Sequence, residues 1–432
     1  MTETKQLQPI EQPLKGEVYV PGDKSISHRA VIFASLARGR SKVEGFLTGE
    51  DCLRTVEAFR MMGVSIEQNG KELIIDSPGV DGFSEPSAPI NFGNSGTTAR
   101  LVAGVLASLP FFTTSFGDES LSRRPMDRVV MPLREMGAHI EGRDGARLLP
   151  LSFIGSRLRG ITYQMPVKSA QVKSAILLAG VLGEGTTTIV EKAKTRDHTE
   201  QMLPRFGVDI FVRGNEISVT GGQTLSPADM KVPGDISSAA FFIAAAAIIP
   251  GSHVIIKDVG LNHTRTGFID ALRLMGAEIN TEITRTVGGE PIGEVEVVHR
   301  KLHGTTIDGD IIPRLIDEIP ILALVATQAG GETIIKDAAE LRVKETDRVE
   351  TTVNVLQKMG AYIIGKEDGM TIQGGASLKG ASLDSMMDHR IGMMISIASM
   401  IAEGTSFLHN GSCIDISYPD FFADLENLVR SS

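Results

Sequence analysis

The feature that most constrains how this chain of 432 residues can fold is an internal repeat. Five expected amphipathic helices each end in a bulky residue followed by glycine, and an alternating, strand-like run follows each glycine. These pairs are Met62-Gly63, Met136-Gly137, Phe206-Gly207, Met275-Gly276 and Met359-Gly360. Glycine is favoured there because it adopts the left-handed backbone conformation without a steric penalty. A sixth helix of the same kind is predicted over Tyr418–Val429.

A second family of helices alternates with the first. Its members are predicted to begin near Ser25, Ser95, Ser169, Ser237, Glu318 and His389. Each runs into a segment rich in Ala, Leu, Ile and Met that is apolar on nearly all sides, which is typical of a buried helix. The repeat length of roughly 70–80 residues exceeds that of a solenoid unit, so the pattern predicts six small α/β units, each with two helices and several strands.

A short motif occurs twice and indicates where the chain divides. Val232-Pro-Gly-Asp-Ile-Ser-Ser-Ala-Ala240 resembles Val20-Pro-Gly-Asp-Lys-Ser-Ile-Ser-His28, and three repeat units lie between the two copies. A chain of this length exceeds what a single core usually holds. We therefore predict an α/β protein of two similar domains, residues 20–232 and residues 1–19 plus 233–432, with three units in each and the active site in the cleft between them.

Composition and charge exclude several classes of partner. The formal net charge is −10 and basic residues form short clusters instead of a stripe, which disfavours nucleic acid and suits a small anion. The longest apolar runs, residues 239–249 and 391–402, are too short to span a bilayer, so no membrane association is expected. Cys52 and Cys413 lack metal-ligand spacing and no hydrophobic signal region opens the chain, which predicts a cytoplasmic protein without disulfides.

Polar side chains gather at the expected starts of the buried helices in the first half of the chain. A helix N-terminus attracts anions through its N–H groups and its dipole, and glycine lets a ligand approach the backbone. The candidate ligand-binding residues are Lys24, Ser25, Arg29, Gly96, Arg124, Ser169, Gln171 and Arg196. Each start also fits a capped helix with solvated polar residues, and His198 is expected to be a capping or surface histidine.

Two carboxylates lie among cations in the second half. Asp317 precedes a buried helix, where it could cap the helix, orient hydroxyl groups or move a proton. The densest charged cluster is residues 342–348; on a helix Lys344 and Arg348 would share a face, with Glu345 one position round. A salt-bridged surface helix is the alternative interpretation of that cluster. Arg390 adds a cation at the start of the sixth buried helix.

The chain lacks the motifs of the common cofactor-dependent sites. It has no P-loop, no dinucleotide-binding glycine pattern followed by an acidic residue, no metal-ligand cluster and no Ser/His/Asp nucleophile motif. Arginine side chains suit bidentate recognition of phosphate or carboxylate. This combination favours acid–base and transfer chemistry between two small anions, with no cofactor and no metal.

Six motifs, spread along the chain in collinear order, match a known family. They are Pro21-Gly-Asp-Lys-Ser-Ile-Ser-His-Arg29, Gly93-Asn-Ser-Gly-Thr97, Arg124-Pro-Met126, Ser169-Ala-Gln171, Arg342-Val-Lys-Glu-Thr-Asp-Arg348 and Asp388-His-Arg390. In these motifs the chain resembles the EPSP synthase family, the 3-phosphoshikimate 1-carboxyvinyltransferases of the shikimate pathway. The resemblance implies helices inside and sheets outside in each unit, and two domains that close over shikimate 3-phosphate and phosphoenolpyruvate.

The resemblance also implies a role for each matched residue. Shikimate 3-phosphate would be bound by Lys24, Ser25, Arg29, Ser169, Gln171, Arg196, Asp317 and Lys344. Phosphoenolpyruvate would be bound by Lys24, Gly96, Arg124, Gln171, Arg348 and Arg390. Asp317 would position and deprotonate the attacking 5-hydroxyl group, while Glu345, with Lys24, would protonate the enolpyruvyl methylene group.

The implied reaction transfers the enolpyruvyl group to the 5-hydroxyl group of shikimate 3-phosphate through a tetrahedral intermediate and releases phosphate. It belongs to chorismate and aromatic amino acid biosynthesis, and the resemblance implies a monomeric enzyme. Two positions depart from the family pattern. Ile416 stands where many relatives carry a lysine, so that phosphoenolpyruvate contact is not implied here, and Glu340 stands where many have asparagine.

Two alternatives to this function remain. UDP-N-acetylglucosamine enolpyruvyl transferases share the implied fold and chemistry, but they typically carry a reactive cysteine before the Arg-Pro motif and an asparagine after the first lysine. Here residues 113–124 contain no cysteine, and Ser25 follows Lys24. The other alternative is a non-catalytic phosphometabolite-binding protein, which is disfavoured because all three proton-handling candidates, Lys24, Asp317 and Glu345, are present.

Overall fold

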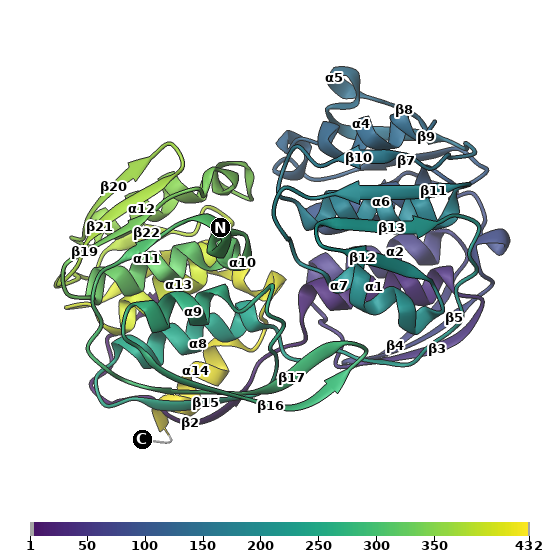
Figure 1. Ribbon diagram of the computed structural model, residues 1–432. Coiled ribbons are helices and arrows are strands. Elements are labelled where there is room, and N and C mark those ends of the chain that lie inside the picture. Colours follow the sequence, from purple (N-terminus) through teal and green to yellow (C-terminus); the bar gives the residue numbers. More distant parts are fainter. Residues whose placement is uncertain (1–3, 431–432) are drawn as a thin grey trace. The chain divides into compact units, whose positions relative to one another are not determined.

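The computed structural model describes residues 4–430, which form two compact units (Figure 1). The first unit comprises Gly22–Val232 together with the turn Val287–Glu290. The second unit comprises the described residues up to Pro21, then Pro233–Thr286, and the chain from Pro291 to residue 430. The chain therefore changes unit inside each copy of the repeated Val-Pro-Gly-Asp motif.

The first unit contains three sheets and the helices that pack on them. Its helices are α1 (Lys24–Leu36), α2 (Glu50–Met61), α3 (Gly96–Leu106), α4 (Asp127–Glu135), α5 (Arg143–Ala146), α6 (Ala170–Leu182) and α7 (His198–Met202), with 3-10 turns η1 (Val80–Gly82), η2 (Leu121–Arg123) and η3 (Leu203–Phe206). Its strands are β3 (Gly39–Glu44), β4 (Ser65–Asn69), β5 (Glu72–Ser77), β6 (Ile90–Asn91), β7 (Thr113–Phe116), β8 (His139–Gly142), β9 (Leu148–Ile154), β10 (Thr162–Gln164), β11 (Thr186–Val190), β12 (Ile210–Arg213), β13 (Glu216–Thr220) and β14 (Met230–Lys231). The strand orders are β14-β3-β5-β4, β6-β7-β9-β8 and β10-β11-β13-β12.

The second unit repeats this plan. Its helices are α8 (Ile236–Ile248), α9 (Gly267–Leu274), α10 (Ile312–Leu315), α11 (Ile319–Gln328), α12 (Arg348–Lys358), α13 (His389–Met400) and α14 (Phe421–Arg430), with 3-10 turns η4 (Gly309–Ile311), η5 (Ile316–Glu318), η6 (Ala339–Val343) and η7 (Gly411–Ile416). Its strands are β1 (Thr4–Leu7), β2 (Lys15–Tyr19), β15 (His253–Gly260), β16 (Glu278–Val287), β17 (Glu290–Val298), β18 (Thr306–Ile307), β19 (Glu332–Ile335), β20 (Tyr362–Lys366), β21 (Gly369–Gln373), β22 (Ser382–Asp384) and β23 (Ser406–His409). The strand orders are β16-β17-β15-β2, β18-β19-β21-β20 and β1-β23-β22.

Five of the six sheets share one topology. An edge strand runs parallel to its neighbour, that neighbour pairs antiparallel with a third strand, and a fourth strand completes the other edge. In the β3–β5 pair, for example, Val43 lies opposite Leu73, and both side chains are buried. The sixth sheet differs because β1 pairs antiparallel with β23, where the other sheets have a hairpin. The repeated topology confirms the prediction of six small α/β units.

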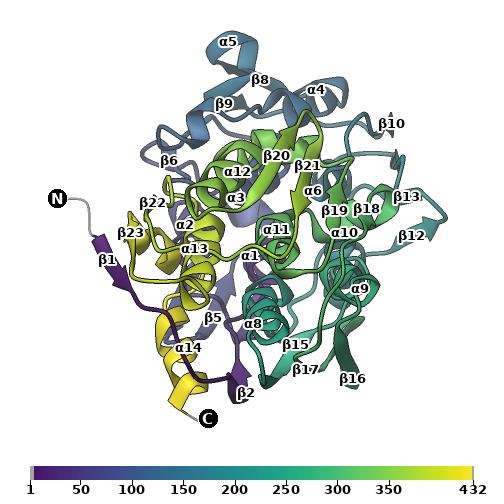
Figure 2. The ribbon, with the colours of Figure 1, turned by 90° about the vertical axis from the view of Figure 1, so that its left-hand side faces the viewer.

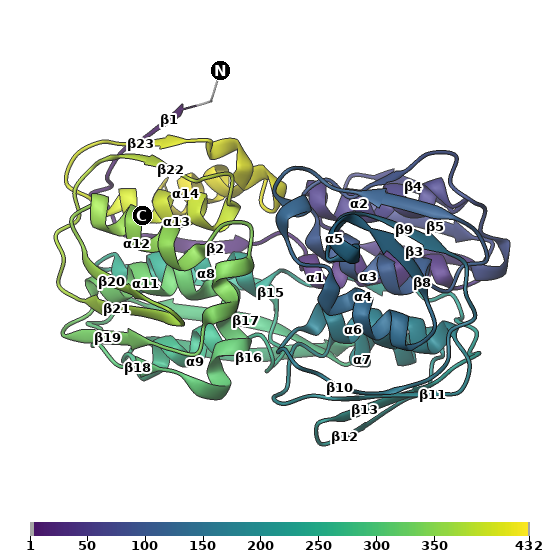
Figure 3. The ribbon, with the colours of Figure 1, turned by 90° about the horizontal axis from the view of Figure 1, so that it is seen from above.

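In each unit the apolar helices lie inside and the sheets lie outside. Every residue of α8 is buried, whereas strands such as β5 alternate between more and less buried positions, as expected for a sheet with one face toward solvent. Figure 2 shows α8, α11 and α13 in the middle of the second unit, with strands of its sheets around them. In the first unit, the view of Figure 3 shows α3 and α6 between the β10–β13 strands and the β3–β5 strands.

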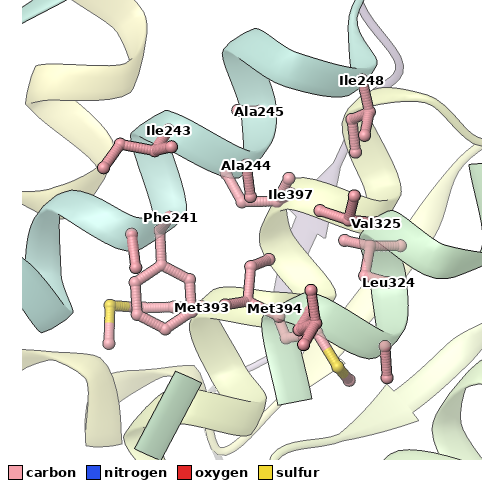
Figure 4. Packing of buried hydrophobic residues seen from close by; sticks show 14 of the residues in the cluster. Phe241, Ile243, Ala244, Ala245, Ile248, Leu324, Val325, Met393, Met394 and Ile397 are labelled. Atoms are coloured by element: carbon pink, nitrogen blue, oxygen red, sulfur yellow. The ribbon is translucent and has the colours of Figure 1, made fainter. Parts of the chain in front are cut away.

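Small residues let the inner helices approach closely. Figure 4 shows Ala244 of α8 among Leu324 of α11 and Met393 and Ile397 of α13. In the first unit a Cβ atom at Gly104 of α3 would lie only 2.2 Å from the carbonyl oxygen of a residue in α6, so only glycine fits at this contact. Each unit has a hydrophobic core of its own.

The first helix family ends as predicted. The helical segments α2, α4, η3, α9 and α12 run up to the five bulky residue–glycine pairs. All five glycines have positive φ, for example 93° at Gly63 and 94° at Gly360, which is the conformation that glycine adopts without strain. The last helix, α14, begins at Phe421 instead of Tyr418, because the preceding segment forms the 3-10 turn η7 and a short loop.

The apolar helices are short. The longest buried ones, such as α6 and α8, have 13 residues each, whereas about 20 are needed to cross a bilayer. Within the described part of the chain, no helix combines the length and the apolar character that a membrane span requires.

Candidate active site

The first group of predicted residues lies at the start of α1 in the first unit. The carboxylate of Asp23 accepts a hydrogen bond from the backbone N–H of Ile26 at 2.8 Å and so caps the helix. Lys24 is then the first helical residue, and its ammonium group lies 2.9 Å from Asp51 Oδ2. Because a cation at a helix N-terminus opposes the helix dipole, the Asp51 carboxylate compensates for this placement. No sequence pattern singles out Asp51.

Arg29 is buried between helices. Its Nε atom donates to the hydroxyl group of Thr199 at 2.8 Å, and Nη2 donates to that of Ser174 at 2.7 Å. Nη1 donates to the carbonyl oxygen of Ser25 at 3.0 Å. These contacts connect α1 with α6 and α7 and fix the guanidinium group beside Ser25, another residue predicted to bind shikimate 3-phosphate.

Gln171 joins the starts of α3 and α6. Its carbonyl oxygen accepts a hydrogen bond from Arg100 Nη1 at 3.0 Å, and its amide nitrogen donates to Thr97 Oγ1 at 2.8 Å. Ser169 precedes it as the N-cap residue of α6. The structure therefore connects two of the matched motifs through Gln171 and Thr97, and it adds Arg100, which is not among the predicted site residues.

Gly96 provides the space in which two arginines meet the start of α3. A Cβ atom there would lie 2.7 Å from Arg100 Nη1 and 3.3 Å from Arg124 Nη1. Arg124 is 7 % exposed, and its Nη2 atom donates to Asn94 Oδ1 at 2.6 Å. This geometry concentrates positive charge at a helix N-terminus, which is an arrangement suited to a small anion.

The loop that carries Arg196 rests on a buried network of charges. Lys173 Nζ lies 2.6 Å from Glu200 Oε1 and 3.2 Å from Glu191 Oε2. Glu191 also accepts a hydrogen bond from the backbone N–H of Thr195 at 3.2 Å. Burial raises the pKa of Glu200, and the charge of Lys173 opposes that effect. The network fixes the backbone next to Arg196.

His28 lies in the middle of the same unit, one turn beyond Lys24. Its Nδ1 atom is 2.7 Å from Thr55 Oγ1, which is 2.8 Å from Thr98 Oγ1, so a chain of hydroxyl groups connects α1, α2 and α3. Burial lowers the pKa of His28 to about 3, because it penalises the charged imidazolium. The charges of Asp51, which raises the pKa, and of Lys24, which lowers it, have smaller effects.

This histidine should make the fold sensitive to acid. The folded-state pKa lies below the unfolded value of 6.5, so the unfolded chain takes up the proton first, and stability is lost as the pH falls from about 6.5 toward 3. At pH 4.5 the loss due to His28 should be about 2–3 kcal/mol relative to pH 7. We expect urea unfolding to show a steeper pH dependence for the wild type than for His28→Gln. Parallel pH dependences for the two proteins would contradict this expectation.

In the second unit, Arg348 is the centre of a cluster of carboxylates. Asp317 Oδ1 lies 3.2 Å from Arg348 Nη1 and 3.3 Å from Lys344 Nζ. Glu345 Oε2 lies 2.6 Å from Nη2 of Arg348, and Asp388 Oδ2 lies 2.8 Å from Nε. Burial acts to lower the pKa of Arg348, but the three carboxylates together raise it above its usual value. Arg348 therefore stays charged although it is only 1 % exposed.

The backbone around this cluster corrects one prediction. Residues 342–348 do not form a helix that places Lys344 and Arg348 on one face. The turn η6 ends at Val343, Lys344 is extended, and α12 begins at Arg348. The reason is local, because Asp347 accepts a hydrogen bond from the backbone N–H of Glu350 at 3.0 Å and caps the helix there. Lys344 and Arg348 meet through Asp317 instead.

The alternative interpretations of this half of the site are also corrected. Asp317 lies inside η5, and α11 begins two residues later with Glu318 at its N-cap position, so Asp317 does not cap the helix. The cluster is no solvated helix surface, since Arg348 is fully buried. Arg390 is fixed at the start of α13, where its Nη1 atom lies 3.3 Å from Glu318 Oε1. Neither Glu318 nor Asp388, which caps α13, was a predicted site residue.

Two further positions differ from simple expectation. His198 is not a surface histidine, because it is 1 % exposed and its Nε2 atom lies 4.0 Å from Glu290 Oε1. It is the first residue of α7, and Asp197 occupies the N-cap position. Ile416, where many relatives carry a lysine, packs half-buried against the hydrophobic core of the second unit.

Comparison with known proteins identifies the family. The family model for EPSP synthase (3-phosphoshikimate 1-carboxyvinyltransferase) matches residues 9–425. The chain belongs to the EPSP synthase family. Among relatives, the 3-phosphoshikimate 1-carboxyvinyltransferase of Oceanobacillus iheyensis is 54% identical over 424 residues, which cover 98% of this chain and 99% of that protein. The protein of the same name from Bacillus subtilis is 52% identical over 422 residues, with 98% and 99% coverage.

Solved structures agree with this assignment to the EPSP synthase family. EPSP synthase from Acinetobacter baumannii aligns with a TM-score of 0.87 at 42% identity, covering 99% of this chain and 98% of that one. The enolpyruvyl transferase NikO from Streptomyces tendae aligns with a TM-score of 0.81 at 18% identity, which shows a shared fold. The predicted fold class is confirmed, and the EPSP synthase family makes this chain a transferase.

Proposed function

We propose that this chain transfers the enolpyruvyl group of phosphoenolpyruvate to the 5-hydroxyl group of shikimate 3-phosphate. The products are 5-enolpyruvylshikimate 3-phosphate and phosphate, in the path to chorismate and the aromatic amino acids. The observation that carries the proposal is that two carboxylates, Asp317 and Glu345, both contact the buried guanidinium group of Arg348. Such a cluster can handle two protons next to a bound anion.

Shikimate 3-phosphate is assigned to residues of both units. Ser25 and Arg29 would bind its carboxylate, and Ser169 and Arg196 its phosphate group. Gln171 would bridge the two substrates, an assignment that its position between α3 and α6 supports. From the second unit, Lys344 would bind the phosphate group and Asp317 the 5-hydroxyl group.

Phosphoenolpyruvate is assigned to the arginine clusters. Arg124, beside Gly96 in the first unit, and Arg348 and Arg390 in the second would bind its carboxylate and phosphate groups as bidentate donors. Lys24 would contact both substrates. Both reactants are anions, so cations in a site that excludes water would reduce their repulsion and stabilise the charge that develops during reaction.

The reaction needs one carbon to be protonated and one oxygen to be deprotonated. A proton from Glu345, or from Lys24, is added to the methylene carbon of phosphoenolpyruvate, which becomes a methyl group and leaves the neighbouring carbon electrophilic. The 5-hydroxyl oxygen bonds to that carbon while its proton passes to Asp317. The carbon–oxygen bond to phosphate then breaks, a methyl proton returns to the base and restores the double bond, and phosphate carries away the hydroxyl proton.

The direct test is phosphate release from phosphoenolpyruvate with different acceptors. We expect release with shikimate 3-phosphate, and none above background with UDP-N-acetylglucosamine or without an acceptor. No turnover with shikimate 3-phosphate, or a preference for the nucleotide sugar, would contradict the proposal. Binding of shikimate 3-phosphate without any turnover would instead indicate a non-catalytic binding protein.

We further propose that both units bind the same pair of substrates and close on them, with one chain as the working enzyme. Holding two reactants in one site supplies several kcal/mol of the barrier reduction. Small-angle scattering of the slow Glu345→Gln variant tests this proposal. We expect the radius of gyration to fall only when both substrates are present, and the forward scattering to correspond to one chain. An unchanged radius, or the mass of a dimer, would contradict it.

The cysteines support a cytoplasmic location. Cys52 and Cys413 are both buried and neither forms a disulfide. Burial raises the pKa of Cys413 to about 11, so at neutral pH it remains a thiol, the less reactive form. We propose that the enzyme works in the reducing cytoplasm, where cell fractionation should recover its activity.

A further inference from the structure

The second copy of the repeated motif has Ile236 and Ala240 where the first has lysine and histidine, so no direct substrate role is assigned to it. Its polar residues nonetheless form a buried network at the start of α8. Asp235 Oδ1 accepts hydrogen bonds from the backbone N–H of Ser237 at 2.8 Å and from Arg265 Nη2 at 3.1 Å. The same Arg265 nitrogen donates to the hydroxyl group of Ser237 at 2.6 Å.

The network continues to a residue assigned to phosphoenolpyruvate. The hydroxyl group of Ser237 donates to Glu318 Oε1, and that oxygen lies 3.3 Å from Arg390 Nη1. Ser237 is in the first turn of α8, Glu318 precedes α11, and Arg390 is the second residue of α13. The network therefore connects the starts of the three inner helices whose apolar side chains pack together in Figure 4.

A buried network of ion pairs like this one is weak evidence of a stabilising role. Its two carboxylates, from Asp235 and Glu318, balance the two guanidinium groups of Arg265 and Arg390, and all four side chains are at most 8 % exposed. Replacing buried ion pairs by apolar residues of similar volume is often neutral or stabilising, because taking charges out of water is costly. What such a network does provide is a fixed position for each group.

The contacts of Arg390 leave most of its N–H hydrogen-bond donors available for a ligand. Within residues 4–430, the guanidinium group donates a hydrogen bond only to Glu318, through Nη1. Arg348 differs, because its Nε, Nη1 and Nη2 atoms all contact carboxylates. Arg390 is thus held at one nitrogen of a fork that has five donors in all, which orients the fork without occupying it.

We propose that Glu318, itself oriented by Ser237 and Arg265, is a positioning residue that sets the guanidinium group of Arg390 for phosphoenolpyruvate binding. This inference rests on the proposed function. Ser237, in the second copy of the motif, thereby contributes to substrate binding through the side chains of Glu318 and Arg390. The carboxylate also offsets the charge of Arg390, so the arginine can stay buried and charged before the substrate arrives.

Steady-state kinetics of Glu318→Gln test the proposal. Glutamine keeps the shape and an acceptor but removes the charge. We expect KM for phosphoenolpyruvate to rise about tenfold, with kcat within about threefold and KM for shikimate 3-phosphate within about twofold of the wild type. Ser237→Ala should change KM for phosphoenolpyruvate in the same direction by about threefold. Thr327→Val, which removes a buried hydroxyl from the same helix α11 but lies outside the network, should leave both KM values unchanged.

A double-mutant cycle shows whether Glu318 acts through Arg390. If it does, Glu318→Gln should add less than twofold to KM for phosphoenolpyruvate when Arg390→Lys is already present. Fully additive effects, an unchanged KM in the single variant, or equal increases for both substrates would overturn the inference while leaving the proposed function intact. A wild type that releases no phosphate from the two substrates would overturn both.

Discussion

Replacing Glu345 with glutamine is expected to lower kcat by about 100- to 10,000-fold, the range typical of losing a general acid or base. KM for each substrate should stay within about threefold of the wild type. Glutamine has nearly the shape of glutamate and keeps an oxygen beside Arg348, which Glu345 contacts at 2.6 Å, so the cluster around the guanidinium group should persist. What is lost is the proton that converts the methylene group into a methyl group.

The matched control is Glu332→Gln, which removes an exposed carboxylate from β19 of the same unit. It should leave kcat and both KM values unchanged. An unchanged kcat in Glu345→Gln would remove the role assigned to this residue. A rise in KM alone, with kcat preserved, would instead make Glu345 a binding residue and leave Lys24 as the candidate acid.

Replacing Arg348 with methionine is expected to cost about 3–5 kcal/mol of unfolding free energy, which is the typical result of removing one partner from a buried ion pair. Arg348 is 1 % exposed and Asp388 is fully buried, and Nε and Nη2 of the arginine donate to its two carboxylate oxygens at 2.8 and 3.2 Å. Without the arginine, the Asp388 carboxylate would lose this charged partner in a site that water does not reach. Urea unfolding measures the loss.

Two comparison variants distinguish the loss of this buried ion pair from the loss of an arginine at the surface. Arg300 pairs with Glu278 at 2.6 Å on the surface of the same unit, and Arg300→Met should cost about 0–1 kcal/mol. Adding Asp388→Asn to Arg348→Met should restore part of the stability, because the stranded charge is then removed. A loss for Arg348→Met no larger than that for Arg300→Met would contradict this account of the cluster.

The arrangement of helices and sheets could be predicted because the signals for it are local. The glycine at position 63 or 360 ends a helix through its own backbone conformation, and the apolar run 239–249 can only be buried. Because the glycine signal recurs five times and the apolar helix six times, the repeat follows without knowledge of any contact. The start of α12 could not be predicted in this way. By local sequence, residues 342–348 fit one continuous helix as well as they fit a helix that Asp347 caps at its start, and the structure has the cap.

The site could be predicted only in part for a related reason. Lys24, Arg124 and Arg390 stand at helix starts, where charge and position in the sequence indicate anion binding. Their partners Asp51, Asn94 and Glu318 come from other helices or loops, and only the packing of the fold brings them together.

The same limit applies to burial. The pattern around residue 29 shows a cation near a helix start, but not that Thr199 and Ser174 from distant segments enclose its guanidinium group. By its sequence spacing alone, Arg348 also fits an exposed, salt-bridged helix, because its partners Asp317 and Asp388 lie outside residues 342–348. Only the tertiary contacts show whether such an arginine is buried in the candidate site or exposed on a helix surface.

Running the reaction in deuterium oxide tests the central claim, addition of the 5-hydroxyl group followed by elimination of phosphate, most directly. The transient methyl group contains one solvent-derived hydrogen, so elimination should leave deuterium in the vinyl group of 5-enolpyruvylshikimate 3-phosphate, with one phosphate released per product. Mass spectrometry and proton NMR read both quantities. A product without vinyl deuterium, or phosphate release that does not depend on shikimate 3-phosphate, would contradict the proposed mechanism.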